Sequence, residues 1–209
     1  MQRIMAGLDP STMSGTVIAV YDLSRPAKEY TQRNWPIAQN GGALIDLNRV
    51  WPGDEAGHNA PTRHAGLLWN RLFKRNVDVA LDYHTAATGG EYTMFMFADL
   101  RDSAIRQLAE LFPIEQIKND PGENGTLETA FVAAGVPVVT IEIGAPRSFD
   151  ARKIAMTVEG SMNVLKHYKV IKGSIAPLRK LKPFLVMRLK RFDRRPEDIL
   201  NCWLISETA

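Results

Sequence analysis

Residues 77–90, VDVALDYHTAATGG, combine an apolar run with a polar end and a glycine-rich turn. A nearly continuous apolar run of this length is typical of a strand that is covered on both faces. Asp82 and His84 interrupt the run near its end. Because they are two residues apart, their side chains would point to the same side of a strand. The segment therefore predicts a buried strand with polar side chains at its carboxyl end.

Further short apolar runs alternate with helical patterns along the chain. We expect strands at residues 16–20, 77–84, 93–98 and 136–144, and helices at 60–75, near 102–112, at 126–134 and after Asp150. The helix at 60–75 would turn one apolar face to the core, with Ala65, Leu68, Trp69, Leu72 and Phe73. Strands separated by helices imply β-α-β units. The pattern predicts an α/β fold whose mainly parallel or mixed sheet is flanked by helices.

Composition favours one cytoplasmic domain. A chain of 209 residues that is 45% hydrophobic can bury one substantial core. No apolar run approaches the roughly 18 residues of a transmembrane helix, and no signal-peptide pattern opens the sequence. The single cysteine, Cys202, excludes an internal disulfide framework and a cysteine-rich zinc site.

Positive charge gathers near the end of the sequence. Between Lys172 and Arg195 stand nine Lys or Arg residues and one acid, Asp193. The periodic pattern also ends before this stretch, although residues 184–192 fit a basic amphipathic helix. We therefore divide the chain into a body, residues 1–171, and a basic tail, residues 172–209. The tail is either a solvated extension or a contact for polyanions through residues 172–195.

A second polar stretch, residues 45–53 (IDLNRVWPG), places an acid, an amide and a guanidinium just before a Pro-Gly turn. A guanidinium binds a carboxylate through two parallel hydrogen bonds, and an amide supplies another donor, so Asn48 and Arg49 could hold an acidic ligand. The alternative is a surface loop in which Arg49 pairs with Asp46 or Asp54. The residues alone leave both interpretations open.

The strand at 136–144 carries one acid, Glu142, between two isoleucines. A buried glutamate needs either a nearby cation or an altered pKa that suits a base. In open α/β sheets, ligands bind at the carboxyl ends of the strands, where Glu142 and His84 would both lie. A lone histidine, however, is more often a hydrogen-bonded structural residue than a metal ligand.

Taken in order, DLNRVWPG (46–53), VDVALDYHTAATGG (77–90) and GVPVVTIEIG (135–144) resemble the catalytic domain of the succinylglutamate desuccinylase/aspartoacylase family. This family is a branch of the zinc carboxypeptidase-like amidohydrolases. The resemblance covers roughly residues 8–170, because LDPSTMSGTVIAV (8–20) is also similar to the family's strand before the substrate loop. It implies a zinc carboxypeptidase-like α/β domain that deacylates N-acyl amino acids or similar amides.

The resemblance also implies roles for particular residues. Asn48 and Arg49 match the pair that grips the carboxylate of a small N-acyl substrate. Arg33 resembles the family's preceding arginine, although its spacing to Asn48 is long. His84 matches a ligand of the catalytic Zn²⁺, and Glu142 matches the general base that takes a proton from the attacking water.

Asp82, two residues before His84, could orient the imidazole as a hydrogen-bond acceptor, which histidine ligands of metals commonly have.

One part of the family pattern is not found in this sequence. The family takes two further zinc ligands from an early His-Gly-x-Glu motif, and a catalytic zinc site normally has three protein ligands plus water. His58 and His64 match no ligand position. We therefore expect a domain that is incomplete at its N-terminal side. Three interpretations follow: a truncated zinc amidohydrolase, a carboxylate-binding paralogue without catalysis, or an interaction protein that uses its basic tail.

Overall fold

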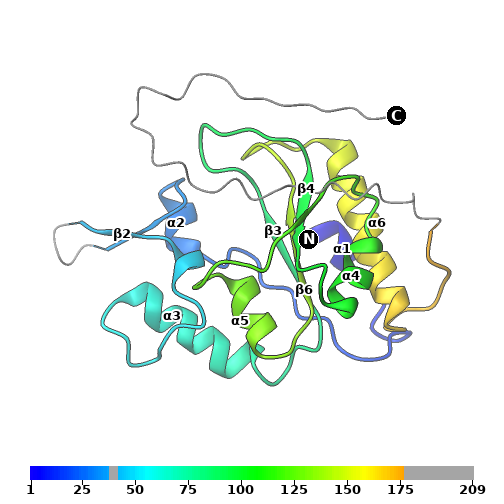
Figure 1. The fold of residues 1–209 in the computed structure, drawn as a ribbon, viewed down its shortest axis with the longest axis horizontal. Helices are drawn as coiled ribbons and strands as arrows, with labels where there is room; N and C mark the ends of the chain where they lie inside the picture. The colour runs from blue at the N-terminus through cyan, green and yellow to red at the C-terminus, as the bar shows by residue number, and fades with distance from the viewer. Residues whose placement is uncertain (38–41, 177–209) are drawn as a thin grey trace.

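The computed structural model describes residues 1–37 and 42–176, which include a mixed sheet with the strand order β3-β6-β4-β5. Strands β3, β6 and β4 are labelled in Figure 1. Strands β3 (Ala80–His84) and β6 (Val138–Glu142) are parallel, as are β4 (Phe95–Ala98) and β5 (Ile117–Asn119). The central pair, β4 and β6, is antiparallel. The predicted α/β fold with a mixed sheet is therefore confirmed.

Helices cover both faces of the sheet (Figure 1). On one face, α4 (Ser103–Glu110) and α6 (Ala151–His167) pack on Val139 and Ile141 of β6. On the other face lie α3 (Ala60–Leu68), η2 (Trp69–Phe73) and α5 (Leu127–Ala133). Val138 belongs to this second core. The alternation along β6 follows from the two-residue period of a strand.

The helix predicted at residues 60–75 forms, but it changes type along its length. Its first nine residues are the α-helix α3, and the remaining turns are the π-helical segment η2. Asn59 caps the start by accepting a hydrogen bond from the Thr62 N–H at 2.9 Å. The predicted core face is confirmed, because Ala65, Trp69 and Phe73 are buried in the second core.

The strand predicted at residues 16–20 is wrong. Among the described residues these five take part in no strand ladder, and Ile18 is 39% exposed. Val20 is partly buried and packs against the second core. A β-branched run favours extended backbone. A strand must also pair with a neighbouring strand, and the sequence of the run does not specify that neighbour.

Several short elements escaped sequence analysis, and most of them precede the sheet. They are α1 (Gln2–Ala6), α2 (Arg25–Glu29), β1 (Trp35–Pro36), β2 (Leu44–Ile45), the 3₁₀ turn η1 (Leu47–Arg49) and the edge strand β5. Strands β1 and β2 pair antiparallel, with Trp35 opposite Ile45. This small ladder brings Arg33, just before β1, close to Asp46, just after β2.

The last stretch that the structure describes is attached to α6. The Ala176 N–H donates to the Asn163 side chain at 3.1 Å, and the Asn163 amide donates to the Leu111 carbonyl at 3.0 Å. Most of the basic tail, including the predicted helix at 184–192, lies outside the described residues. In the part that is described, none of the helices is long and apolar enough to cross a membrane.

The start of α6 offers a test of local stability. Asp150 accepts hydrogen bonds from the N–H groups of Arg152 and Lys153 at 2.8 and 3.0 Å. Asp150→Ala should therefore lower the free energy of unfolding by about 1 kcal/mol in urea titrations, the usual effect of losing an N-cap. Asp78→Ala, on an exposed residue outside the helices, is the control. Equal stability of the two variants would contradict the capping role.

Candidate active site

The floor of the candidate site is a double row of polar side chains at the carboxyl ends of β3 and β6. Asp82 lies opposite Thr140 in the parallel ladder, and His84 lies opposite Glu142. Because all four positions have the same parity, their side chains share one face of the sheet. Earlier on this face, Val138 is buried in the second core. The polar site therefore begins where the apolar core ends.

The expected contact between Asp82 and His84 is confirmed. The Nε2 atom of His84 lies 2.9 Å from an Asp82 carboxylate oxygen. Burial opposes protonation of His84, but the charge and hydrogen bond of Asp82, with the charge of Glu142, outweigh burial and raise the pKa of the imidazole. With Nε2 engaged, Nδ1 is the ring nitrogen left for a ligand.

Glu142 has a partner that sequence analysis missed. The Tyr92 hydroxyl donates to a Glu142 carboxylate oxygen at 2.6 Å. Burial, this hydrogen bond and the charge of Glu142 raise the pKa of Tyr92, so the phenol remains a proton donor. Tyr92 stands in the loop between β3 and β4, eight residues after His84 in the sequence. No periodic pattern there marks it as a neighbour of Glu142.

A cavity of about 200 Å³ opens beside this floor. It joins residues between Leu23 and Trp51 to residues of β3 and to Leu127 of α5, and Glu142 lies outside its lining. The lining consists of Leu23, Ser24, Arg33, Asp46, Leu47, Asn48, Trp51, Asp82, Tyr83, His84 and Leu127. Five residues that we singled out from the sequence, Arg33, Asp46, Asn48, Asp82 and His84, thus line one cavity.

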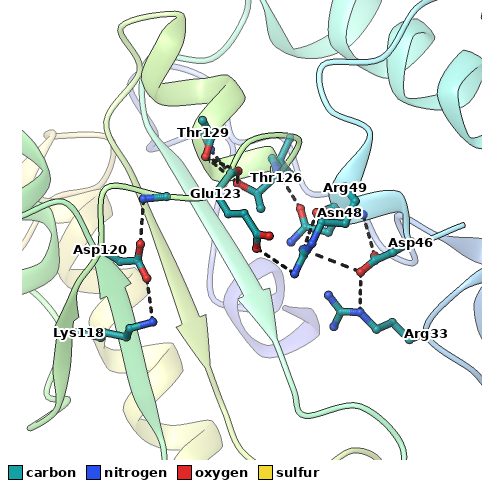
Figure 2. Close-up of polar contacts among 11 residues, drawn as sticks. Arg33, Asp46, Asn48, Arg49, Lys118, Asp120, Glu123, Thr126 and Thr129 are labelled. Carbon is teal, nitrogen blue, oxygen red and sulfur yellow. Dashed lines mark hydrogen bonds and ion pairs between the residues drawn. The ribbon is translucent and has the colours of Figure 1, made fainter. Parts of the chain in front are cut away.

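Asp46 organises the cationic wall of the cavity (Figure 2). One oxygen of its carboxylate accepts from the backbone N–H of Asn48 at 2.9 Å, which caps η1. The other oxygen lies 2.8 Å from the Arg33 Nε and 3.9 Å from the Arg49 Nη1. The long sequence spacing before Asn48 is bridged by the β1–β2 ladder, which brings Arg33 back to Asp46. Asp46, which was considered as a partner of Arg49, lies closer to Arg33.

Asn48 and Arg49 are docked on the segment that precedes α5. The Asn48 carboxamide oxygen accepts from the Leu127 N–H at 2.8 Å, which leaves its Nδ2 group as the donor for a ligand. The Trp51 N–H donates to the Gly125 carbonyl at 2.9 Å. Gly125 has a φ of 86°, and a Cβ atom there would collide with the Arg49 carbonyl group. The loop is thus positioned by contacts with the backbone of residues 125–127.

The guanidinium of Arg49 is paired in the structure. Its Nη2 atom lies 3.1 Å from a Glu123 carboxylate oxygen, in addition to the longer contact with Asp46. Asp54, the other partner considered, instead accepts from the Ala56 N–H at 2.9 Å. Glu123 was missed by sequence analysis because it is 74 positions away from Arg49.

A buried carboxyl group lies beside Thr140 on the same face of the sheet. Glu128 of α5 is only 9% exposed and accepts a hydrogen bond from the Thr140 hydroxyl at 3.0 Å. Burial raises the pKa of Glu128 to about 7, and the Thr140 hydrogen bond only partly opposes this. The negative charges of Asp120 and Asp82 add to the increase, and His84 reduces it. No sequence pattern pointed to Glu128.

The described residues do not by themselves make up a zinc site. Among them, no group of three or more His, Cys, Asp or Glu side chains is placed to hold a metal ion. His84 offers one ring nitrogen, whereas a catalytic zinc site has three protein ligands. His64 has a structural role, since its ring lies 3.0 Å from the Leu23 carbonyl oxygen and packs against Trp35.

Comparison with known proteins gives a consistent picture. The model of the succinylglutamate desuccinylase/aspartoacylase catalytic domain matches residues 1–168. N-alpha-acetyl-L-2,4-diaminobutyric acid deacetylase from Halomonas elongata is 25% identical over 182 residues, which are 84% of this chain and 51% of that protein.

Solved structures agree in fold. A product-bound structure of the ectoine utilization protein EutE (DoeB) from Ruegeria pomeroyi superposes with a TM-score of 0.71 at 25% identity, over 86% of this chain and 55% of that one. A succinylglutamate desuccinylase/aspartoacylase from Rhodobacter sphaeroides gives 0.70 at 24% identity, over 86% and 53%. The chain spans about half the length of these relatives.

Proposed function

Because this chain belongs to the succinylglutamate desuccinylase/aspartoacylase family, we propose that its cavity binds a small N-acyl amino acid for removal of the acyl group. The observation that carries the proposal is the shared cavity of Arg33, Asn48 and His84. Further support comes from the Halomonas elongata relative, whose name describes a deacetylase of an N-acetylated amino acid.

In this proposal the loop around Asn48 holds the substrate's carboxylate. Arg33 and Arg49 both reach the carboxylate of Asp46, so their guanidinium groups stand near one another. A substrate carboxylate would accept hydrogen bonds from these groups and from the Asn48 Nδ2. Charge-assisted bonds of this kind fix the orientation of a ligand as well as its affinity, which aims the amide at the floor of the site.

The chemistry is assigned to Glu142. Its carboxylate would take a proton from the water that attacks the amide carbonyl and would return a proton to the departing amine. Tyr92 restrains this carboxylate by a hydrogen bond of 2.6 Å. His84, oriented by Asp82, is proposed as one ligand of a catalytic Zn²⁺. Since the described residues form no three-ligand group, the proton transfer is argued from Glu142 alone.

Arg49→Lys tests the proposal. Lysine keeps the charge but cannot form the two-pronged hydrogen bond, so binding of an N-acyl amino acid should weaken by about 1.5–3 kcal/mol in calorimetric titrations. Arg71→Lys is the matched control, because Arg71 also pairs with a glutamate, Glu55, at 2.8 Å on the exposed surface. Unchanged affinity in Arg49→Lys would indicate that Arg49 forms a structural salt bridge and does not bind the ligand. Arg49-dependent binding without turnover would favour a carboxylate-binding protein over an enzyme.

A further inference from the structure

The cationic groups beside the cavity are already balanced by carboxylates. Arg33 pairs with Asp46, and Arg49 pairs with Asp46 and Glu123. Two guanidinium groups therefore face two carboxylates before any ligand binds. Asp82, which also lines the cavity, adds further negative charge next to His84.

The backbone of Glu123 is fixed by hydrogen bonds to its carbonyl oxygen (Figure 2). Its carbonyl oxygen accepts three hydrogen bonds: from the Thr126 N–H at 3.1 Å, from the Thr126 hydroxyl at 2.8 Å and from the Thr129 hydroxyl at 2.8 Å. Just before it, the Gly122 N–H donates to the Asp120 carboxylate at 3.0 Å. These bonds fix the point from which the Glu123 side chain reaches toward Arg49.

The other half of the ion pair is equally fixed. The close approach at Gly125 and the bond between Leu127 and Asn48 lock the backbone of Arg49 onto the same segment. The Glu123 side chain is nevertheless 68% exposed. An exposed ion pair adds little to folding stability. We therefore expect the Arg49–Glu123 pair to affect ligand binding, because it sets the net charge that a ligand meets.

We propose that Glu123 is a specificity-determining residue that neutralises Arg49, so that the site takes N-acyl amino acids with one carboxylate and a neutral or cationic side chain. This inference rests on the proposed carboxylate-binding role of the loop. A single carboxylate can share the donors of Arg33, Asn48 and Arg49. The second carboxylate of an N-acyl aspartate or glutamate would find Arg33 and Arg49 already paired with Asp46 and Glu123, and would lie near the carboxylate of Asp82, which disfavours it.

Glu123→Gln tests this inference, because glutamine keeps the size of the side chain and removes its charge. The full chain is titrated with N-acetylalanine and with N-acetylaspartate at one ionic strength. The original protein should bind N-acetylalanine more tightly. In Glu123→Gln, affinity for N-acetylaspartate should rise about five- to tenfold, while affinity for N-acetylalanine changes less than about twofold. Glu55→Gln, which breaks the exposed pair with Arg71, should change neither affinity.

Three outcomes would overturn the inference: tighter binding of N-acetylaspartate by the original protein, an equal gain for both ligands in Glu123→Gln, or no gain for either. Binding of N-acetylalanine to Arg49→Lys shows whether the role of Glu123 or the proposed carboxylate-binding function has failed. If N-acetylalanine binds in an Arg49-dependent manner while Glu123→Gln has no effect, only the role of Glu123 is wrong. If neither ligand binds any of the proteins, both proposals fall.

Discussion

Glu142→Gln should leave binding of an N-acyl amino acid nearly intact and lower its hydrolysis about 10²–10⁴-fold, the usual effect of losing a general base. Glutamine has nearly the same shape, and its carbonyl oxygen can still accept the hydrogen bond that Tyr92 now gives to Glu142. It cannot, however, take a proton from water. Turnover and calorimetric affinity are measured on the same zinc-supplemented preparations, so that a loss of rate is separated from a loss of binding.

The effect of Glu142→Gln on hydrolysis can be measured only in a protein that binds zinc and turns over substrate. Within residues 1–37 and 42–176, His84 is the one residue matched to a ligand position, so we expect this chain to hold Zn²⁺ weakly and to turn over slowly. Adding an upstream segment with His-Gly-x-Glu should give one zinc per chain and a measurable rate, and Glu142→Gln in that protein should keep the zinc and lose the rate. Stoichiometric zinc and rapid turnover in residues 1–209 would show that ligands were missed, and His58 and His64 would be examined first.

Tyr92→Phe is the matched control for Glu142→Gln. It removes the hydrogen bond to Glu142 but keeps the carboxylate, so it should reduce turnover less than about tenfold. A Glu142→Gln protein that retained most of its activity would exclude Glu142 as the base. An equal loss in both variants would indicate that the hydrogen bond, rather than the proton acceptor, matters most.

The parts of the fold that were predicted correctly are those determined by the residues of each segment itself. The apolar runs that form β3 and β6 contribute side chains to the core on each face of the sheet, and this environment leaves a direct mark on composition. Strand direction is different, because it depends on which edges meet. The antiparallel pairing of β4 with β6 had no local signal. The run at residues 16–20 failed for the same reason, since extended propensity does not provide a partner strand.

The candidate site shows the same division. Asp82 and His84 lie two residues apart on one strand, so their contact could be anticipated from the period of a strand. Arg33 reaches the cavity only through the β1–β2 ladder, whose first strand is two residues long. Tyr92 and Glu123 come from loops, and a loop's neighbours are set by tertiary structure. Sequence therefore anticipated a contact between neighbours on one strand, but not the loop residues that hydrogen-bond or pair with Glu142 and Arg49.

Glu128→Gln should stabilise the protein increasingly as the pH rises from about 4.5 to about 7. Burial raises the pKa of Glu128 to about 7 in the folded state, whereas the usual value is 4.5. The folded protein thus holds a proton that the unfolded chain releases, and its stability falls as the pH rises through this window. The full loss is on the order of 3 kcal/mol, because one pKa unit corresponds to about 1.4 kcal/mol. Glutamine is neutral at every pH and can still accept from Thr140.

Urea unfolding at pH 5 and pH 8, at one ionic strength, measures this effect. The variant and the original protein should be similar at pH 5, and the variant should be more stable at pH 8 by up to about 3 kcal/mol. Taking the difference between the two proteins at each pH largely cancels the titration of distant groups. Glu110→Gln, at the exposed end of α4, should show no such pH-dependent gain. A difference for Glu128→Gln that is the same at both pH values would mean that Glu128 is already ionised in the folded protein at pH 5.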